Sequence, residues 1–493
     1  MNNNSHASKC LFSLVAKKLL LTMFLAFTLT ISSCSGNKSP SISNANIPNN
    51  GDLSLAQFDD TNPIVLNYAV ASKPSKEEQI VIEKFNESNN GYLIALKDYS
   101  DYFDSKDSEW YQISEEKQKL FNIAITQDIS KGEIDIIRDR YLGSPNTMDL
   151  LANRGYLVDL YQFMNSDTAV NQSTLNSHVL ELHETDEKLY ELPTVYVVNT
   201  LVGKTCYVGG KENWTFDDMV YYWKKMPEGS MIDGHREKDY VYMTILRGCL
   251  SSYINYKDAS VSFDSSEFKR MLEFCNSFDM PLDYYNEYNS NSINFVESKR
   301  INGFTIFHND VIWNYEDQPI TLVGYPTENA SGGFINSIGE RFAICASTSD
   351  EKLQGAWEFI RMFAMDEYLY DYCCPSELSF VNGSEEKVYL NQHGFPINNG
   401  VFNRIAEDTI NGRFVNKSTE SSIDEPDFGL PTQEEISRLT EYINSIQNNE
   451  SSIDNDLWAI INDEINGYFN GEKTLDETAS YIQDRARLMV SEK

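Results

Sequence analysis

Short apolar runs rich in β-formers alternate with amphipathic helical segments from residue 63 onward. The first three runs stand at residues 63–70, 91–96 and 134–137. Helical segments follow them, at residues 75–85, 120–129 and 148–155. The first helix opens with the capping pattern Ser75-x-x-Glu78, and its apolar spacing predicts that Ile80, Val81 and Phe85 face inward. The alternation predicts an α/β fold with a parallel or mixed sheet flanked by helices.

Helical faces are clearer in the second half of the chain. One apolar stripe comprises Leu353, Ala356, Trp357, Ile360, Phe363 and Ala364, and we expect Trp357 to be core. A second stripe runs through residues 475–489. Helix starts are predicted at Thr215, at Thr432-x-x-Glu435 and at Thr474-x-x-Glu477. The run at residues 304–307 is predicted to be a strand.

The N-terminus resembles a lipoprotein leader. A basic region with Lys9, Lys17 and Lys18 precedes an apolar stretch at 19–31, which is short for a membrane span. It ends in Ile31-Ser32-Ser33-Cys34, which resembles a lipobox. We therefore expect residues 1–33 to be a signal peptide, Cys34 to be the lipid anchor, and the Ser-, Asn- and Pro-rich residues 34–62 to be a flexible tether. An ordinary signal peptide or a transmembrane anchor is the alternative.

Charge and cysteine spacing narrow the classes of partner. The chain has 74 acidic and 40 basic residues, a formal net charge of −34, which argues against binding to nucleic acid. Beyond Cys10 and Cys34 there are six cysteines, and none forms a CxxC pair, so a zinc site is not expected. Most of these cysteines are predicted to be small core residues.

Catalytic and cofactor signatures are absent from the sequence. It contains no HExxH, GxSxG, GxxxxGK[ST] or GxGxxG motif, so no metal, nucleotide or other cofactor is expected and the chain is not expected to be an enzyme. Carboxylates are so abundant that no acid pair stands out, and composition therefore leaves a glycosidase open.

Several segments, in order, resemble one family. They include Asp135-Ile136-Ile137, with Ile134 where the family has proline, and Leu192-Pro193 followed by Asn199-Thr200-Leu201. Others stand at residues 83–89, 155–160, 214–219, 324–333, 343–359, 395–398 and 475–487. Together, over residues 63–493, they resemble the extracellular solute-binding proteins of bacterial ABC importers, of the carbohydrate-binding, maltose-binding-protein-like class.

The resemblance implies a type II periplasmic-binding-protein-like fold, with two α/β lobes joined by a three-segment hinge. One lobe would comprise residues 63–197 and 339–397, and the other residues 198–338 and 398–493. The hinges would lie near residues 196–202, 335–342 and 396–403. Few crossing segments between two rigid cores permit closure around a solute.

Candidate ligand-binding residues follow from this fold, because ligands of open α/β sheets sit beyond the carboxyl ends of the strands. The first lobe offers Ser72, Tyr99, Asp101, Asp139, Arg140 and Tyr141, and the second offers Tyr253, Asn309, Trp313, Gly332 and Gly333. Aromatic rings suit sugar faces, and Asp, Asn and Arg suit sugar hydroxyls. The alternatives are plain surface positions for the tyrosines, solvated loop positions for the aspartates and an ion-paired surface cluster for residues 138–140.

The resemblance implies a lipid-anchored, monomeric receptor on the outer side of the cell membrane. It would bind a carbohydrate, most simply an oligosaccharide, and deliver it to an ABC permease. The sequence has no Walker motif, so the ATPase would be a separate protein. A secreted glycosidase, and a sensor or adhesin that uses the same fold, are the alternatives.

Overall fold

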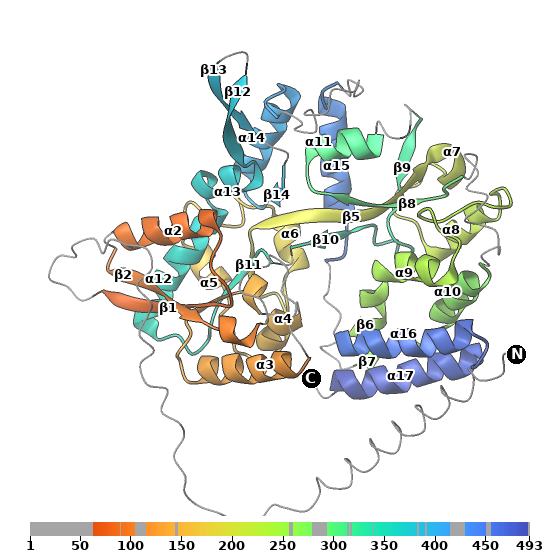
Figure 1. The fold of residues 1–493 in the computed structure, drawn as a ribbon, viewed down its shortest axis with the longest axis horizontal. Coiled ribbons are helices and arrows are strands. Elements are labelled where there is room, and N and C mark those ends of the chain that lie inside the picture. Colours follow the sequence, from red (N-terminus) through yellow and green to blue (C-terminus); the bar gives the residue numbers. More distant parts are fainter. Residues whose placement is uncertain are drawn as a thin grey trace, which may run out of the picture. The chain divides into compact units, whose positions relative to one another are not determined.

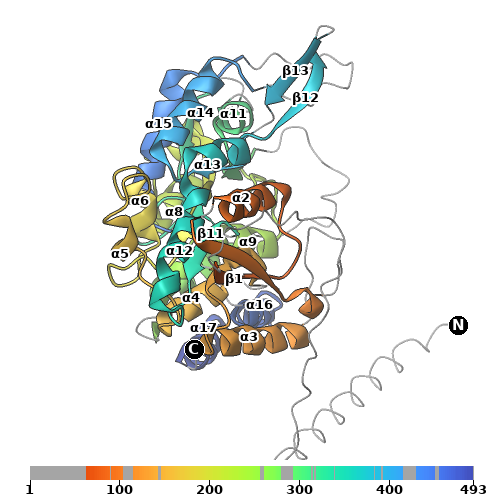
Figure 2. The same cartoon turned by 90° about the vertical axis from the view of Figure 1, so that its left-hand side faces the viewer.

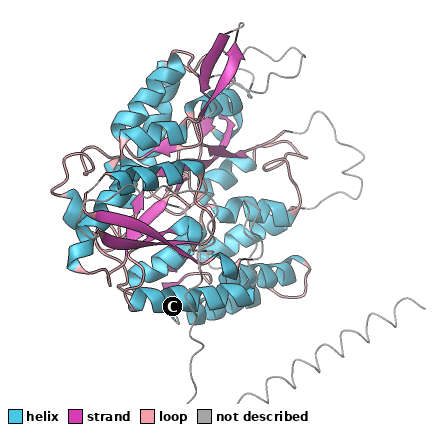
Figure 3. Ribbon diagram, turned by 60° about the vertical axis from the view of Figure 1, so that its left-hand side comes forward, coloured by secondary structure: helices cyan, strands magenta, loops and turns pink. Residues whose placement is uncertain are grey.

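Two five-stranded β-sheets and the helices packed on them form the described part of the chain (Figures 1 and 3). The computed structural model describes residues 63–88, 90–103, 115–142, 146–255, 260–278, 293–312, 315, 318–337, 339–381, 384–389, 392–414, 429–449 and 455–491. The predicted signal peptide, the anchor Cys34 and the tether lie outside these residues. None of the helices in these residues combines the length and the apolar composition that a membrane-spanning segment needs.

The first sheet has the strand order β2-β1-β3-β11-β4. Its strands are β1 (Ile64–Val70), β2 (Tyr92–Asp98), β3 (Ile136–Arg138), β4 (Leu192–Pro193) and β11 (Arg341–Ile344). β1 runs parallel to β2 and β3, whereas β11 runs antiparallel to β3 and β4. The mixed sheet predicted from the first three apolar runs is therefore confirmed.

Helices cover the first sheet, and their sequence signals explain where they start. They are α2 (Lys76–Glu87), α3 (Glu115–Ser130), α4 (Asn146–Asn153), α5 (Tyr161–Met164), α6 (Ser177–Leu182), α12 (Asp350–Ile360) and α13 (Asp366–Cys373). The Ser75 side chain caps α2, which buries Val81 and Phe85 as predicted. Ile80 was predicted to face inward, but it is 43% exposed. Trp357 of α12 is buried, as predicted.

β5 (Val195–Lys204) is the central strand of the second sheet. It pairs antiparallel with β8 (Glu297–Ile301), β9 (Ile320–Leu322), β10 (Phe334–Asn336) and β14 (Phe395–Pro396). Its side chains alternate between two cores: Val198 and Val202 pack into one, and Leu201 into the other. Both faces of this sheet are therefore covered.

Nine helices are described around the second sheet and beyond it, among the residues given above. They are α7 (Thr205–Val208), α8 (Phe216–Trp223), α9 (Lys238–Arg247), α10 (Ser266–Asn276), α11 (Phe304–Ile306), α14 (Asn399–Ile410), α15 (Gln433–Ser445), α16 (Asn455–Phe469) and α17 (Leu475–Ser491). Capping boxes open α8 at Thr215 and α15 at Thr432. The strand predicted at 304–307 is wrong, because these residues form α11 and the start of the π-helical turn η4 (Phe307–Ile312).

Two hairpins complete the secondary structure. They are β6 (Ile254–Asn255) with β7 (Ser260–Val261), and β12 (Ser376–Val381) with β13 (Ser384–Tyr389). Five of the six cysteines beyond Cys34 are buried, and Cys206 is exposed, which agrees with the prediction that most of them are core residues.

Three segments of the chain pass between the two sheets. The first joins β4 to β5, the second joins β10 to β11, and the third runs from α13 through the β12–β13 hairpin to β14 (Figure 1). The core beside the first sheet also takes in Val401 of α14 and Leu439 of α15. The lobe boundaries at 197/198, 338/339 and 397/398 stay predictions.

Candidate functional site

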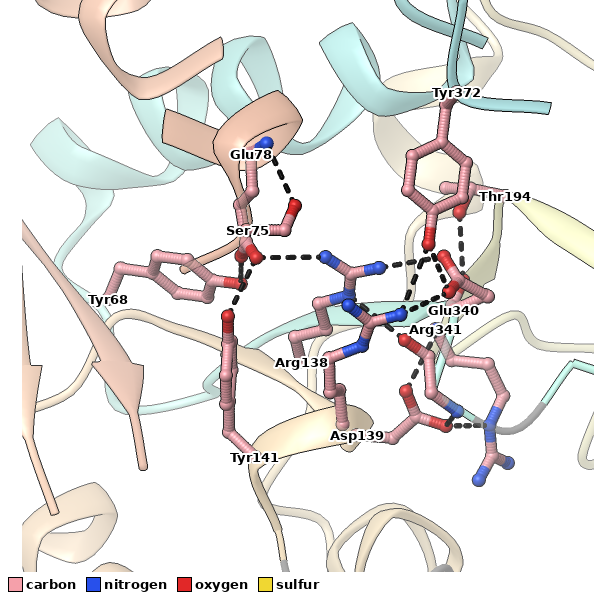
Figure 4. A network of polar contacts seen from close by, with 12 residues as sticks. Tyr68, Ser75, Glu78, Arg138, Asp139, Tyr141, Thr194, Glu340, Arg341 and Tyr372 are labelled. Atoms are coloured by element: carbon pink, nitrogen blue, oxygen red, sulfur yellow. Dashed lines mark hydrogen bonds and ion pairs between the residues drawn. The ribbon is translucent and has the colours of Figure 1, made fainter. Parts of the chain in front are cut away.

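The carboxyl end of β3 meets the first two crossing segments at a place where charged and phenolic side chains gather (Figure 4). β3 ends at Arg138, which pairs with Phe342 of β11 in the antiparallel ladder. The turn η2 (Asp139–Tyr141) follows it. In open α/β sheets this edge, beyond the carboxyl ends of parallel strands, is where ligands bind.

Arg138 is the centre of a buried ion-pair network. Its Nη2 donates to Glu340 Oε2 at 2.7 Å, and its Nη1 lies 3.2 Å from Glu78 Oε2. Its Nε donates to the carbonyl oxygen of Gly339 at 3.0 Å. Burial by itself would lower the pKa of the guanidinium, but the carboxylates of Glu340 and Glu78 raise that pKa well above its usual value. Arg138 therefore holds α2 and the second crossing segment to the end of β3.

Glu78 receives two phenolic hydroxyls in addition to the Arg138 ion pair. Tyr68 donates to Oε1 at 2.5 Å and Tyr141 donates to Oε2 at 2.7 Å. Burial, and then the nearby charge of Glu78, raises the pKa of both phenols, so both remain donors. The Glu78 carboxylate therefore bonds within the network. Of the capping box predicted at Ser75, only one half forms: the Ser75 side chain accepts a hydrogen bond from the Glu78 backbone N–H.

A second chain of ion pairs runs from Asp139 to the first crossing segment. Asp139 Oδ2 accepts from the Nε of Arg341 at 2.7 Å, and Arg341 Nη1 donates to Glu191 Oε1 at 2.9 Å. His183 Nδ1 lies 2.9 Å from the same oxygen of Glu191. Burial alone would raise the pKa of Glu191, but the charge of Arg341 and the hydrogen bond from His183 lower it to about 2.

Solvent reaches the ion-pair network of Arg138 at Arg140, and it reaches the ion-pair chain of Asp139 at Asp149. The Arg140 side chain is 35% exposed, and its Nη2 donates to Glu340 Oε1 at 2.9 Å and to the Tyr372 hydroxyl at 3.1 Å. Asp149 is 43% exposed, and its Oδ1 lies 3.6 Å from Arg341 Nη1. A planar guanidinium and carboxylates in partly open positions can form paired hydrogen bonds with the hydroxyls of a solute. Among the residues that the structure describes, no group of His, Cys, Asp and Glu side chains is arranged to hold a metal ion.

Three residues of the predicted site lie in accessible positions beyond the first sheet. Ser72 is half-buried after β1, Asp101 is exposed in the turn η1 (Ser100–Tyr102) after β2, and Arg140 follows β3. Asp139, Tyr99 and Tyr141 are buried instead. Tyr99 donates its hydroxyl to Asp128 Oδ2 at 2.7 Å, so all three have partners inside the protein. Residues 138–140 are ion-paired as the alternative interpretation expected, but Arg138 and Asp139 are not at the surface.

The binding residues predicted on the second lobe differ from one another in their burial. Tyr253 is buried against Phe263 and Phe268, and Asn309 is half-buried in η4. Trp313 lies outside the described residues. Ligand contact by any of the predicted residues stays a prediction.

Gly332 and Gly333 have structural reasons to be glycine. Gly332 has φ +83°, and a Cβ there would lie 2.6 Å from Asn213 Oδ1. A Cβ at Gly333 would lie 2.5 Å from the carbonyl oxygen of Asn199 on β5. The positive φ and the Asn213 side chain explain Gly332, and the close approach of the β5 backbone explains Gly333, without a ligand.

The sequence did not indicate an exposed aromatic pair at the start of α9. The rings of His235 and Tyr240 stack with centroids 4.2 Å apart and planes 7° apart, and Tyr240 is 55% exposed. A flat ring face in an open position is the type of surface on which sugar rings stack. Because the two residues lie on either side of a helix start, neither helical nor strand periodicity relates them.

Two pockets stand out in the described part of the chain. One, of about 400 Å³, lies between α2, α12 and α13, and it is lined mainly by apolar side chains such as Ile80, Met362 and Met365. The other, of about 570 Å³, lies between the loop before α6, α14 and α15. Neither pocket is lined by a residue of the predicted ligand site.

Comparisons with known proteins identify the fold. No family model and no curated protein sequence matches the chain. Among solved structures, a periplasmic oligogalacturonide-binding protein from Yersinia enterocolitica matches with a TM-score of 0.52 at 11% identity, over 87% of this chain and 99% of its own. A designed esterase matches with a TM-score of 0.50 at 12% identity, over 87% and 99%. An extracellular solute-binding protein of family 1 from Alicyclobacillus acidocaldarius gives 0.47 at 12% identity, over 87% and 100%.

The match to the oligogalacturonide-binding protein, with a TM-score of 0.52, confirms the predicted fold class. The chain has the α/β fold of periplasmic solute-binding proteins, with two sheets joined by three crossing segments. At such low identity the likeness shows the fold and does not show a ligand.

Proposed function

We propose that this chain is an extracytoplasmic solute-binding protein that holds a carbohydrate between its two lobes. The observation that carries the proposal is the pair of sheets joined, in the described part of the chain, by three crossing segments, with the end of β3 hydrogen-bonded to the second crossing. Hinged lobes of this kind close on a solute and release it unchanged. An acylated Cys34 would tether the protein to the membrane, and a separate ABC permease would receive the solute.

Two features support a carbohydrate as the solute. A solved structure with the same fold is described as an oligogalacturonide-binding protein. In this chain, the stacked rings of His235 and Tyr240 offer a flat apolar face, and Arg140 and Asp101 offer planar polar groups to hydroxyls. An oligosaccharide, which presents several ring faces and many hydroxyls, is the ligand class that we favour.

A hydrolytic enzyme is the second candidate, since a designed esterase shares the fold. Binding without turnover separates the two functions: a receptor returns its sugar intact, whereas a glycosidase releases shorter products. A sensor or adhesin would also bind without turnover, and a permease encoded beside this chain would favour transport over that role.

The test is a thermal-shift and calorimetry screen of the purified mature chain against neutral and acidic oligosaccharides, with product analysis of each mixture. A ligand that binds only the folded state raises the melting temperature. At a hundredfold excess of free ligand over Kd, it adds about 2.7 kcal/mol to the free energy of unfolding. We expect at least one oligosaccharide to do this and to be recovered unchanged.

Two variants locate the binding. Tyr240→Ala and Trp313→Ala should each weaken the shift, while Tyr481→Ala, which removes a 52% exposed ring from α17, should leave it unchanged. If no oligosaccharide binds, or if the sugar is cleaved, the proposed function is wrong.

A further inference from the structure

The pocket of about 570 Å³ is built from three separate parts of the chain, α6 with the loop before it, α14 and α15. Figure 2 shows these three helices near one another, toward the left of the view. α14 and α15 each contribute three positions with the spacing i, i+3, i+4, which places them on one helical face. On α14 these are Asn399, Phe402 and Asn403, and on α15 they are Thr440, Ile443 and Asn444.

Hydrogen bonds fasten the walls of this pocket to one another. Asn399 Nδ2 donates to the carbonyl oxygen of Leu175 at 2.7 Å, which joins α14 to the loop before α6. His178 Nε2 lies 2.7 Å from the carbonyl oxygen of Ile446, which joins α6 to the end of α15. Because each bond ties together segments far apart in the sequence, the pocket is formed before a ligand arrives, and little ordering is needed on binding.

The lining of the pocket is polar but carries no acid or strong base. None of the described residues that line it is Asp, Glu, Lys or Arg, although these four types make up 23% of the chain. Its polar side chains are mainly amides, from Gln172, Asn176, Asn399, Asn403 and Asn444. The pocket has no fixed charge to compensate the desolvation of an ion, so it favours a neutral ligand.

Amides and hydroxyls match the hydrogen-bonding pattern of a polyol. An amide has two N–H donors and an acceptor oxygen, and a hydroxyl both donates and accepts. Part of this capacity is used within the protein, because Asn399 donates to Leu175, the Asn176 oxygen accepts from the Val179 N–H, and the hydroxyls of Ser173 and Thr440 donate to Asn171 and to Ile436. The other donors and acceptors of these side chains serve a ligand. Each hydroxyl of a sugar also donates and accepts. The ring of Phe402 is half-buried in the same wall and offers an apolar surface to the C–H face of a sugar.

We propose that this pocket is a binding site for a neutral polyhydroxylated compound, a small sugar or a sugar alcohol. It shares no residue with the predicted interlobe site, although by the predicted boundaries residues 172–178 belong to one lobe and residues 399–444 to the other. The proposal does not depend on the function proposed above. Its volume falls in the range of small-molecule sites, about 300–1,000 Å³.

Hydrogen–deuterium exchange of the mature chain with maltose, trehalose, sorbitol or myo-inositol tests the site. At least one of these probes should slow exchange in residues 172–178, 399–403 and 440–444. Glucuronate and glucosamine, which carry a charge, should bind there at least tenfold more weakly than the neutral probe that protects these segments.

Variants decide whether the site is real and independent. Asn403→Ala combined with Asn444→Ala should weaken the neutral probe by about tenfold or more, because hydrogen bonds to two exposed amides are lost. Asn470→Ala, at an exposed position just after α16, is the matched control and should change nothing. Tyr240→Ala should also leave protection of this pocket intact.

The proposal is overturned if none of the four neutral probes protects these segments at millimolar concentration, or if the double variant binds like the parent. It is also overturned if Tyr240→Ala removes the protection, since the effect would then come from the interlobe site. Failure of the oligosaccharide screen with protection retained here would contradict the proposed function alone.

Discussion

The guanidinium of Arg138 is the single side chain on which the polar network depends. It is fully buried between two carboxylates, Glu78 and Glu340. Arg138→Met would leave the buried Glu78 without its cation and would leave Glu340 with Arg140 alone, so we expect the free energy of unfolding to fall by about 3–5 kcal/mol. Arg140→Met, at a side chain 35% exposed and paired with the same Glu340, should cost under about 1 kcal/mol. Urea unfolding followed by tryptophan fluorescence measures both, and equal losses would contradict this account.

The network also shows what the sequence could not indicate about individual residues. The motif at 138–140 stood out because of its charges, but its partner Glu340 is about 200 residues away. A charged tripeptide after a strand has the same local pattern whether it is solvated or buried. Contacts with residues far away in the sequence decide whether the tripeptide is solvated or buried, and a single sequence does not indicate those contacts. For the same reason Tyr99 and Tyr141, predicted for a ligand, have internal partners.

At the scale of elements, the approach of β10 to β5 requires glycine at residue 333. A Cβ on Gly333 would lie 2.5 Å from the carbonyl oxygen of Asn199 and 3.1 Å from the Tyr442 hydroxyl. Gly333→Ala should therefore destabilise the protein by about 1–3 kcal/mol whether or not a sugar is present. Gly210→Ala is the control, because its nearest atom would be 4.0 Å away, and it should cost about 0.5 kcal/mol or less. A Gly333→Ala protein of normal stability that fails only in sugar binding would instead restore this glycine to the ligand site.

Elements with long, regular patterns were predicted well. β1, α12 and α17 appear where the periodicity placed them, and Thr432 caps α15 as its capping box predicted. The failure at residues 304–307 has a simple cause: four apolar residues do not distinguish a buried strand from a buried helical turn. The α/β class was therefore predictable from these patterns, and the three crossings were implied by the resemblance to a family. The stacked pair at α9 and the pocket between α6, α14 and α15 depend on tertiary packing that local patterns do not contain.

At the scale of the whole molecule, two opposite effects of protonation compete. The formal net charge of −34 at pH 7 makes the folded chain repel itself, and protonating exposed carboxylates relieves this repulsion. The buried carboxylate of Glu191 acts in the other direction. Its pKa is lowered from 4.5 to about 2, so Arg341 and His183 stabilise its charged form only in the folded state.

Because the two effects have opposite signs, the free energy of unfolding should pass through a maximum as the pH is lowered. Glu191 contributes its full stabilisation above pH 4.5, on the order of 3 kcal/mol, and loses it as the pH falls toward 2. We therefore expect the free energy of unfolding to rise as the pH is lowered from 7 to about 5, where repulsion fades, and to fall below about 4.5. Urea titrations across this range measure the curve.

Glu191→Gln should be less stable at pH 7, and its free energy of unfolding should fall less steeply below pH 4.5. Glu434→Gln, exposed in the first turn of α15, is the control and should follow the parent. A parent curve that kept rising to pH 3 would mean that surface repulsion outweighs the buried ion pairs.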